Sequence, residues 1–546
     1  MSDFISFPQW QWQVPRHFNI GVACTDRHLE SPIAQTIAMI VEDDKLGTQQ
    51  ITFSELSRRT NQFAQLLRNL NIAVGERVLI RLPNCLDYPT AFLGAMKLAA
   101  ISVPTSTLLT IEEILYLARD SAASVLVIDK EMWAKLACHI RDCPALKVIL
   151  LSGQGEIATG LQNSDIQVLD LDQSLQAIEQ WDPAHNTKAD DPAYLVYTSG
   201  TTGYPKGVLH AHRALIGRTP ASTYWFDFSE TSQDRIVHSG KFNWTYVLGS
   251  GLMDPLYLGK TVIVYEGQND ANTWPKLIAK HKATIFIGVP TIYRQVLQKT
   301  GFTQVDVPSL RHCMSAGEHL SDEVLQNWQQ RFEIDIYEAV GMSEFSYYLC
   351  ETKSRPIRPG SAGFPQPGHD IQLLDPATLQ GVERGQEGMI CVPDDDPGLF
   401  LEYWNLPEET AKLKHDGWFF TGDYARYDDD GYIWFLGRKD DIIKSFGYRV
   451  SPYEIERVLK SHPKVADCAA VGEEISKDKV LVVAYVILQA NQNLSADELY
   501  EFGKQNLAAY KAPKVVYLAE DFPRTKNGKI LRREIKPTIA VARSGS

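Results

Sequence analysis

The sequence lacks the patterned cysteines that mark a disulfide framework or a zinc site. Its 8 cysteines are scattered over 546 residues and form no C-x-x-C pair. A secretory signal is also missing, because residues 1–17 are polar and aromatic rather than basic and then apolar. The longest apolar stretch, 91–104, is interrupted by Lys97 and is too short to cross a bilayer. We therefore expect a cytoplasmic protein in a reducing compartment, without integral membrane association.

Positive charge is scarce as well. Lys and Arg number 54 against 67 Asp and Glu, which gives a formal net charge of -13. Surfaces that bind nucleic acid are usually basic, so this balance excludes a nucleic-acid partner and favours small-molecule chemistry. The 44% hydrophobic and 22% charged residues are typical of a soluble globular protein. At about 150 residues per domain, the length predicts three or four domain-sized units.

Alternating strand and helix patterns predict the fold class. Short runs of β-branched residues are separated by segments of helical periodicity such as 53–70, which is the pattern of β/α units on largely parallel sheets. The strand-like runs lie at 77–81, 124–128, 148–151, 194–197, 261–265 and 284–287. Gly and Pro become frequent over 360–401, which predicts an antiparallel sheet or small β-barrel.

The pattern changes again after Gly437, where a helix is predicted over 452–461 and strands over 468–471 and 480–488. We expect an α/β protein with two domains. The large N-terminal domain, 1–438, holds the β/α subdomains and the small β-barrel, and the small α+β C-terminal domain comprises 439–546.

A loop rich in glycine and hydroxyl groups follows the strand predicted over 194–197. Its glycines let backbone N–H groups approach a ligand, its hydroxyls add donors, and Lys206 supplies a cation, which together predict a phosphate cradle. The residues assigned to this cradle are Thr198, Ser199, Gly200, Thr201, Thr202, Gly203 and Lys206. A flexible surface loop is the alternative, and a P-loop kinase is another, although Pro205-Lys206-Gly207 does not fit a Walker A motif.

This loop is similar to the signature of the adenylate-forming superfamily, which includes acyl-CoA synthetases, peptide-synthetase adenylation domains and luciferases. Further similar segments follow in the expected order across about residues 46–533. The resemblance implies that Gly317 and Glu318 lie on the adenine side of the nucleotide. It also implies that Ser343 donates to the α-phosphate and that Glu344 holds Mg²⁺, a hard cation that prefers oxygen ligands. Taken alone, the tetrapeptide 341–344 has an alternative, a helix start at Ser343 followed by a surface Glu.

The resemblance assigns the ribose to a later pair of residues. Asp423, in the segment Thr421-Gly422-Asp423, would accept the ribose hydroxyls, and Arg438 would reach the ribose and phosphate region. A surface turn with a local ion pair is the alternative for both residues.

The resemblance further implies that the C-terminal domain is mobile, with Asp440 as its hinge. Lys529 would bridge the incoming carboxylate and the α-phosphate, and with Thr198 and Lys206 it completes the expected catalytic residues. Gly447 would leave a channel for the pantetheine arm of coenzyme A, and Arg449 would neutralise phosphate. Without the resemblance, a turn glycine and a solvated basic tail are the ordinary interpretations.

Segment 240–249 is similar to the acid-pocket segment of benzoate-type CoA ligases. The substrate contacts that this implies are Lys241, Phe242, Trp244, Thr245, Tyr246 and, after Glu344, Tyr347. Aromatic rings suit a flat apolar acid, although each ring alone is equally typical of a core. Benzoate-specific enzymes usually have a His where this chain has Tyr347, so a substituted aryl, cyclic or medium-chain acid stays open.

The resemblance thus implies an ATP-dependent, AMP-forming acyl-CoA ligase. A carboxylic acid, aromatic by the pocket resemblance, would become an acyl-adenylate with release of pyrophosphate, and coenzyme A would then displace AMP. ATP, Mg²⁺ and coenzyme A are the expected cofactors, and a monomer or homodimer is the expected state. An adenylation enzyme that loads a carrier protein, or a non-enzymatic nucleotide-binding scaffold, are the alternatives.

Overall fold

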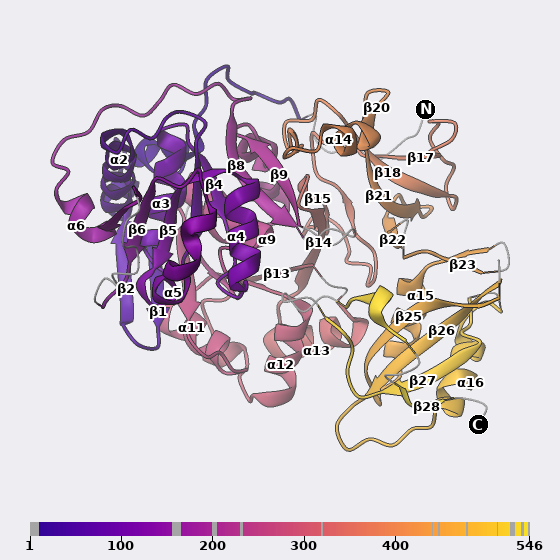
Figure 1. Ribbon diagram of the computed structural model, residues 1–546. Coiled ribbons are helices and arrows are strands. Elements are labelled where there is room, and N and C mark those ends of the chain that lie inside the picture. The colour runs from indigo at the N-terminus through magenta and orange to yellow at the C-terminus, as the bar shows by residue number, and fades with distance from the viewer. Residues whose placement is uncertain are drawn as a thin grey trace.

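The computed structural model describes residues 10–155, 165–198, 205–229, 233–317, 320–438, 441–445, 448–476, 479–509, 511–524, 530–536 and 540–543. Two large sheets form most of the molecule (Figure 1). Both are parallel in the middle; the nine-stranded sheet is antiparallel at both edges and the eight-stranded sheet at one. This is the arrangement that the alternating pattern predicts, and each predicted strand is present. The α/β fold class is confirmed.

The nine-stranded sheet, in spatial order, consists of β16 (Phe364–Pro365), β15 (Ser346–Cys350), β14 (Ile336–Met342), β13 (His312–Ala316), β12 (Ile285–Gly288), β10 (Arg235–His238), β11 (Thr261–Glu266), β1 (Ile37–Asp43) and β2 (Gly47–Thr52). The eight-stranded sheet consists of β19 (Glu402–Tyr403), β9 (Lys206–Ala211), β8 (Pro192–Thr198), β4 (Ile101–Pro104), β3 (Arg77–Arg81), β5 (Ala123–Asp129), β6 (Val148–Ser152) and β7 (Gln167–Asp170).

Two helices pack between these sheets. One hydrophobic cluster contains Phe63 of α2 (Phe53–Asn69), Phe92 of α3 (Asp87–Lys97), Ile80 of one sheet and Val264 of the other. Helix α2 begins at a capping box, in which the Thr52 hydroxyl accepts from the Glu55 amide at 3.2 Å and the Glu55 carboxylate accepts from the Thr52 amide at 2.9 Å. The periodic segment 53–70 is therefore helical, as predicted.

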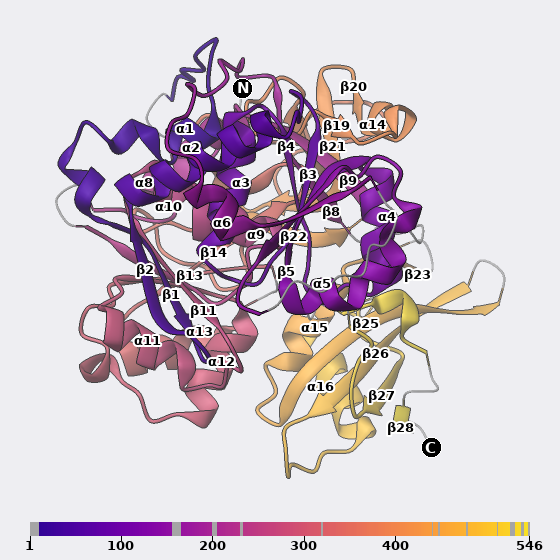
Figure 2. The same cartoon turned by 60° about the vertical axis from the view of Figure 1, so that its left-hand side comes forward.

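Other helices cover the outer faces of the two sheets. Trp133 of α5 (Lys130–Leu136) and Leu117 of α4 (Ile111–Asp120) pack on the eight-stranded sheet. The nine-stranded sheet is covered by α11 (Thr273–His281), α12 (Pro290–Lys299) and α13 (Asp322–Phe332), which Figure 2 shows together on one side. Each large sheet is thus buried on both faces, which explains why its strands are nearly continuous apolar runs.

An antiparallel sheet begins within 360–401, where Gly and Pro become frequent, and is completed by strands that extend to Arg438. It contains β17 (Gln372–Leu374), β18 (Glu387–Pro393), β20 (Lys414–His415), β21 (Trp418–Tyr427) and β22 (Ile433–Arg438). Every described pairing within it is antiparallel. Helix α14 (Pro407–Leu413) lies in the connection between β19 and β20.

The last part of the chain builds its own sheet and core. It contains β25 (Val465–Ser476), β26 (Lys479–Leu488), β27 (Val515–Ala519) and β28 (Ala540–Arg543), with α15 (Pro452–Lys460) and α16 (Ala496–Asn506). Ile455 and Leu499 of these two helices share a hydrophobic cluster with Val482, Ala484 and Val486 of β26. Figures 1 and 2 show this unit beside the rest of the molecule. Within the described ranges, no helix combines the length and apolar character that a membrane crossing requires.

Candidate active site

Two paired strands hold the ends of the predicted phosphate cradle. The antiparallel register of β8 and β9 places Thr198 opposite Lys206, so the connection between them begins and ends at one point of the sheet. Lys206 Nζ lies 3.1 Å from Glu409 Oε2 in α14 and 5.5 Å from the ring centroid of Tyr403. The other residues assigned to the cradle, Ser199, Gly200, Thr201, Thr202 and Gly203, lie outside the described residues.

Ser343 and Glu344 form the turn between β14 and β15. Glu344 is only 9% exposed, and its carboxylate accepts a hydrogen bond of 2.6 Å from the Tyr403 hydroxyl. Burial and the Glu344 charge raise the pKa of Tyr403, which keeps this phenol protonated as a donor. Since Tyr403 also contacts Lys206, the structure brings the predicted metal ligand and the predicted phosphate cation together. The alternative of a helix start with a surface Glu is wrong.

His210, which sequence reasoning missed, lies behind this turn. Its Nε2 is 2.8 Å from the backbone oxygen of Ser343, and its ring stacks on Tyr194 at 4.7 Å. Burial lowers the pKa of His210 to about 3, so the ring is neutral and Nε2–H donates to the carbonyl. In the sequence, only the position of His210 in β9, shortly after the predicted phosphate cradle, could have indicated a place near the site.

Asp423 and Arg438 face each other across neighbouring strands. The register of β21 and β22 pairs the two residues, and Arg438 Nε lies 3.4 Å from Asp423 Oδ1. Asp423 is 3% exposed and its Oδ2 lies 3.5 Å from the Tyr348 hydroxyl. The carboxylate raises the pKa of Arg438 above its usual value. A carboxylate this buried does not fit a surface turn, whereas it fits the predicted binding of a polar ligand group.

Several residues predicted to contact the acid form one aromatic cluster. The ring centroid of Tyr246 lies 5.2 Å from that of Trp244 and 6.1 Å from that of Trp225. The Tyr347 ring lies 4.6 Å from the same Trp225 ring. Trp244 also contacts Gly317, on the predicted adenine side, so the acid and nucleotide segments meet here. Sequence reasoning missed Trp225, because no motif contains it.

Lys241 and Phe242 lie apart from this cluster. Lys241 Nζ is 2.5 Å from Glu266 Oε2, and Phe242 is 1% exposed with its ring 5.0 Å from that of Tyr88. Both residues anchor the segment to β11 and α3. Thr245 is the first residue of the short helix α9 (Thr245–Leu248). The roles of these three residues in substrate binding stay predictions.

Four more predicted residues, Glu318, Asp440, Gly447 and Lys529, lie outside the described residues, as does the side chain of Arg449. Their roles also stay predictions.

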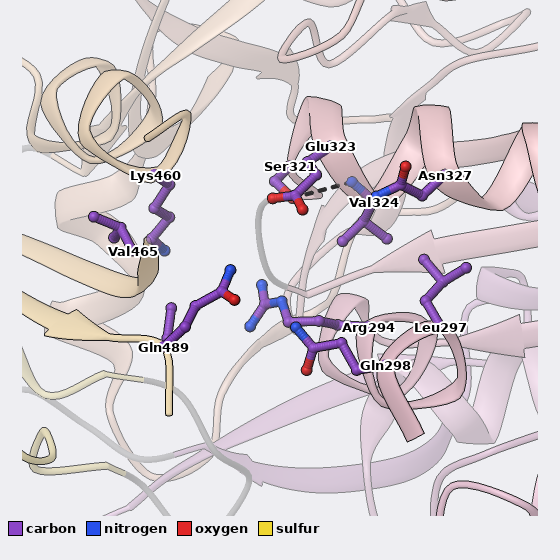
Figure 3. A pocket seen from close by; sticks show the side chains of 11 residues that line it. Arg294, Leu297, Gln298, Ser321, Glu323, Val324, Asn327, Lys460, Val465 and Gln489 are labelled. Carbon is purple, nitrogen blue, oxygen red and sulfur yellow. Dashed lines mark hydrogen bonds between the residues drawn. The ribbon is translucent and has the colours of Figure 1, made fainter. Parts of the chain in front are cut away.

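A small hollow lies away from all these residues, between the nine-stranded part and the C-terminal unit (Figure 3). It is lined by Arg294, Leu297 and Gln298 of α12, by Ser321, Glu323, Val324 and Asn327 at α13, and by Lys460, Val465, Ala466 and Gln489. Its volume of about 50 Å³ accommodates a few water molecules but no nucleotide. It is therefore part of the contact between the two units and not a substrate site.

Comparison with known proteins identifies the class. A model of the AMP-binding enzyme family matches residues 31–404, and a model of the AMP-binding enzyme C-terminal domain matches residues 454–529. The chain belongs to the AMP-binding enzymes. The predicted superfamily is confirmed, and so is the enzyme class, an ATP-dependent and AMP-forming acyl-CoA ligase. The expected ATP, Mg²⁺ and coenzyme A are the cofactors of this class.

Individual relatives cover nearly the whole chain. Benzoate–CoA ligase of Thauera aromatica is 32% identical over 531 residues, which are 96% of this chain and 97% of the relative. The 3-hydroxybenzoate–CoA ligase of Aromatoleum sp. (strain CIB) is 31% identical over 504 residues, 91% and 93% of the two chains. The crystal structure of the anthranilate CoA ligase AuaEII in complex with anthranoyl-AMP has a TM-score of 0.84 at 30% identity and covers 95% of this chain and 96% of its own.

Proposed function

We propose that the protein activates an aromatic carboxylic acid, a benzoate or substituted benzoate, and transfers the acyl group to coenzyme A. The observation that carries this proposal is the aromatic cluster of Trp225, Trp244, Tyr246 and Tyr347 in contact with Gly317. Flat rings favour an aryl group by stacked and edge contacts. The names of the relatives, which act on benzoate and 3-hydroxybenzoate, support the same class of acid.

The chain's own residues would bind ATP along one path. Thr198, the residues 199–203 and Lys206 hold the phosphates, and Ser343 donates to the α-phosphate. Glu344 would hold Mg²⁺, because its buried carboxylate accepts a single hydrogen bond from the described residues, that of Tyr403, and retains oxygen lone pairs. Mg²⁺, when bound, neutralises charge on the phosphate oxygens.

The remaining contacts fix the nucleoside. Asp423 accepts the ribose hydroxyls, Arg438 lies beside the ribose and phosphate, and Gly317 with Glu318 lies on the adenine side. Arg438 pairs with Asp423 and Lys206 pairs with Glu409, so each cation would exchange a protein carboxylate for ligand oxygens when ATP binds.

Chemistry requires two displacements. A carboxylate resists attack by a thiol because it is anionic and would have to expel oxide. A carboxylate oxygen therefore first bonds to the α-phosphorus, and the bond to pyrophosphate breaks. The sulfur of coenzyme A then bonds to the acyl carbon, and the bond to AMP breaks. Lys529 would stabilise the charge of the first displacement by bridging the acid and the α-phosphate.

The C-terminal domain, residues 439–546, would change position between the two displacements. It would turn about Asp440, withdraw Lys529 and present Gly447 and Arg449 to coenzyme A, a hinge type of domain motion. The N-terminal domain, 1–438, would supply the acid and ATP sites. We further propose that the protein is cytoplasmic and acts as a monomer or homodimer.

The test is AMP formation from ATP with benzoate, with and without coenzyme A. We expect steady turnover only when both are present. Lys529→Ala should lose acid-dependent pyrophosphate exchange but keep transfer from a supplied acyl-adenylate, whereas the matched variant Lys526→Ala should keep both. Absence of AMP with every organic acid offered would refute the proposal, and turnover that requires a carrier protein instead of coenzyme A would change the acceptor.

A further inference from the structure

A buried ion pair lies directly behind the aromatic cluster. Arg218 follows the short helix α7 (Ala214–Gly217), and Asp254 begins α10 (Asp254–Tyr257). The Nε and Nη2 atoms of Arg218 lie 2.8 Å and 2.9 Å from the two carboxylate oxygens of Asp254, and each residue is only 5% exposed. This bidentate geometry fixes the plane of the guanidinium.

The backbone next to this pair leaves room only for glycine. A Cβ on Gly249 would stand 1.3 Å from Arg218 Nη2. Gly249 is the first residue of a π-helical turn, Gly249–Met253, that joins α9 to α10. Such turns are rare and frequently occur at functional sites. The segment that carries Tyr246 is therefore shaped around the Arg218 side chain.

Arg218 also determines how the Tyr347 hydroxyl is oriented. Nη2 donates to the Tyr347 oxygen at 2.6 Å, and Nη1 donates to the Ser346 hydroxyl. A guanidinium has only donors, so the Tyr347 oxygen must accept and its own hydrogen must point elsewhere. In the part of the chain that the structure describes, that hydrogen is donated to no acceptor.

A second phenol in the cluster also has unused hydrogen-bonding capacity. The Tyr246 oxygen is buried and has no hydrogen-bond partner among the described residues. Both phenol rings lie against Trp225, at centroid distances of 6.1 Å for Tyr246 and 4.6 Å for Tyr347. A buried polar group without a partner is unfavourable, so a ligand that pairs with it gains affinity.

We propose that Tyr347 and Tyr246 determine specificity by binding an oxygen substituent on the ring of the aromatic acid. This inference rests on the proposed function and narrows its substrate class to hydroxy- or alkoxybenzoates. Tyr347, oriented by Arg218, donates to the substituent oxygen, and Tyr246 donates to it or accepts the proton of a phenol. Arg218 and Asp254 are positioning residues that act through Tyr347.

Unsubstituted benzoate is the disfavoured substrate in this arrangement. It would bury both phenol groups without giving them a partner. Sites that hydrogen-bond a substrate hydroxyl reject the analogue lacking it far more strongly than apolar pockets reject a missing methylene group. The ratio of kcat/KM between a hydroxybenzoate and benzoate therefore reports the proposed contact, whatever the absolute rate.

The experiment measures AMP release with coenzyme A present for benzoate, the three monohydroxybenzoates, 3-methoxybenzoate and 3-aminobenzoate. We expect the wild type to prefer its best oxygen-substituted acid over benzoate by at least about 10-fold in kcat/KM. Tyr347→Phe and Tyr246→Phe should each reduce this ratio by about 5-fold or more. In the matched control Tyr432→Phe, which removes a hydroxyl that donates to the Pro356 oxygen at 2.7 Å, the ratio should not change.

The outcomes separate the two proposals. A wild-type ratio near one, a ratio unaffected by both Phe substitutions, or a preference for the amino-substituted acid would overturn the oxygen-binding role while leaving activation of aromatic acids intact. Activity with straight-chain acids and none with any aromatic acid would refute the proposed function itself. Arg218→Lys tests the positioning role, because it keeps the charge but loses the bidentate pair with Asp254. We expect the ratio of kcat/KM between the oxygen-substituted acid and benzoate to fall in this variant. General destabilisation would lower both values and leave their ratio unchanged.

Discussion

The indole of Trp244 lies directly against Gly317. A Cβ on Gly317 would stand 3.1 Å from Cη2 and 3.2 Å from Cζ2 of that ring. Gly317 also has a φ of +93°, in the region where side chains are strained. Two segments that are distant in the chain, one predicted for the acid and one for adenine, therefore touch without an intervening side chain.

Gly317→Ala should raise KM for both the acid and ATP, by about 5-fold or more, because the new methyl group displaces Trp244 and strains the backbone. Steady-state kinetics with each substrate varied in turn measures this. Gly385→Ala is the matched control, since Gly385 has a φ of +79° but no atom within 4 Å of the place that a Cβ would take, so it adds strain alone. Equal kinetics in both variants would mean that the indole contact is unimportant.

Glu409→Gln should strengthen ATP binding. Glu409 holds Lys206 at 3.1 Å, and this partly exposed pair must break when phosphate arrives. Exposed pairs contribute little because water screens them, so we expect KM for ATP to fall only by about 2- to 5-fold. The change should shrink at high salt, which screens the pair. Glu408→Gln removes an equal charge one residue earlier and should leave KM unchanged; a similar fall there would argue against a specific competition.

Asp254→Asn should destabilise the fold strongly, because it leaves the buried Arg218 charge without its counterion. Breaking such a pair costs about 3–5 kcal/mol. Asp190→Asn is the comparison, since it breaks the pair with Arg213 at a carboxylate that is 77% exposed, where the loss should stay below about 1 kcal/mol. Urea unfolding of both variants gives the two free energies, and similar values would contradict the burial argument.

Burial raises the pKa of the Glu351 carboxyl from 4.5 to about 8. Between these values the native state binds a proton that the unfolded state has lost, so stability should fall as pH rises from about 4.5 to 8, by up to about 1.4 kcal/mol per pH unit. Glu351→Gln cannot titrate and should have a shallower slope than the wild type, whereas the neighbouring Glu338, whose pKa burial also raises, keeps its own contribution in both proteins. Denaturant unfolding at several pH values across this window tests it, with the exposed Glu383→Gln as a control for the charge. The prediction would be contradicted if the free energies of unfolding of the Glu351→Gln variant and the wild type differed by the same amount at every pH.

The strands and the helix over 53–69 could be predicted because their signals are local. A buried strand needs a run of apolar residues, and α2 has both its periodic face and its Thr52 cap within the segment itself. Asp423 and Arg438 were likewise recognisable from short motifs, and the register of two adjacent strands brings them together.

The rest of the site depends on contacts between distant segments. Tyr403 reaches Glu344 from 59 residues away, and Arg218 reaches Tyr347 from 129 residues away. No sequence motif around Tyr403 or Arg218 predicts these contacts, because they form only when distant segments of the chain pack together. The same packing turns Lys241 toward Glu266, although its local motif predicts a substrate contact.

Arg438 is both the last residue of β22 and the residue opposite Asp423 in the ladder. In the chain it immediately precedes the C-terminal domain that the sequence predicts to begin at residue 439. A molecule that binds the Asp423 carboxylate would therefore compete directly with the Arg438 side chain. The predicted ribose contact and the predicted start of the C-terminal domain therefore lie next to each other in the chain at Arg438.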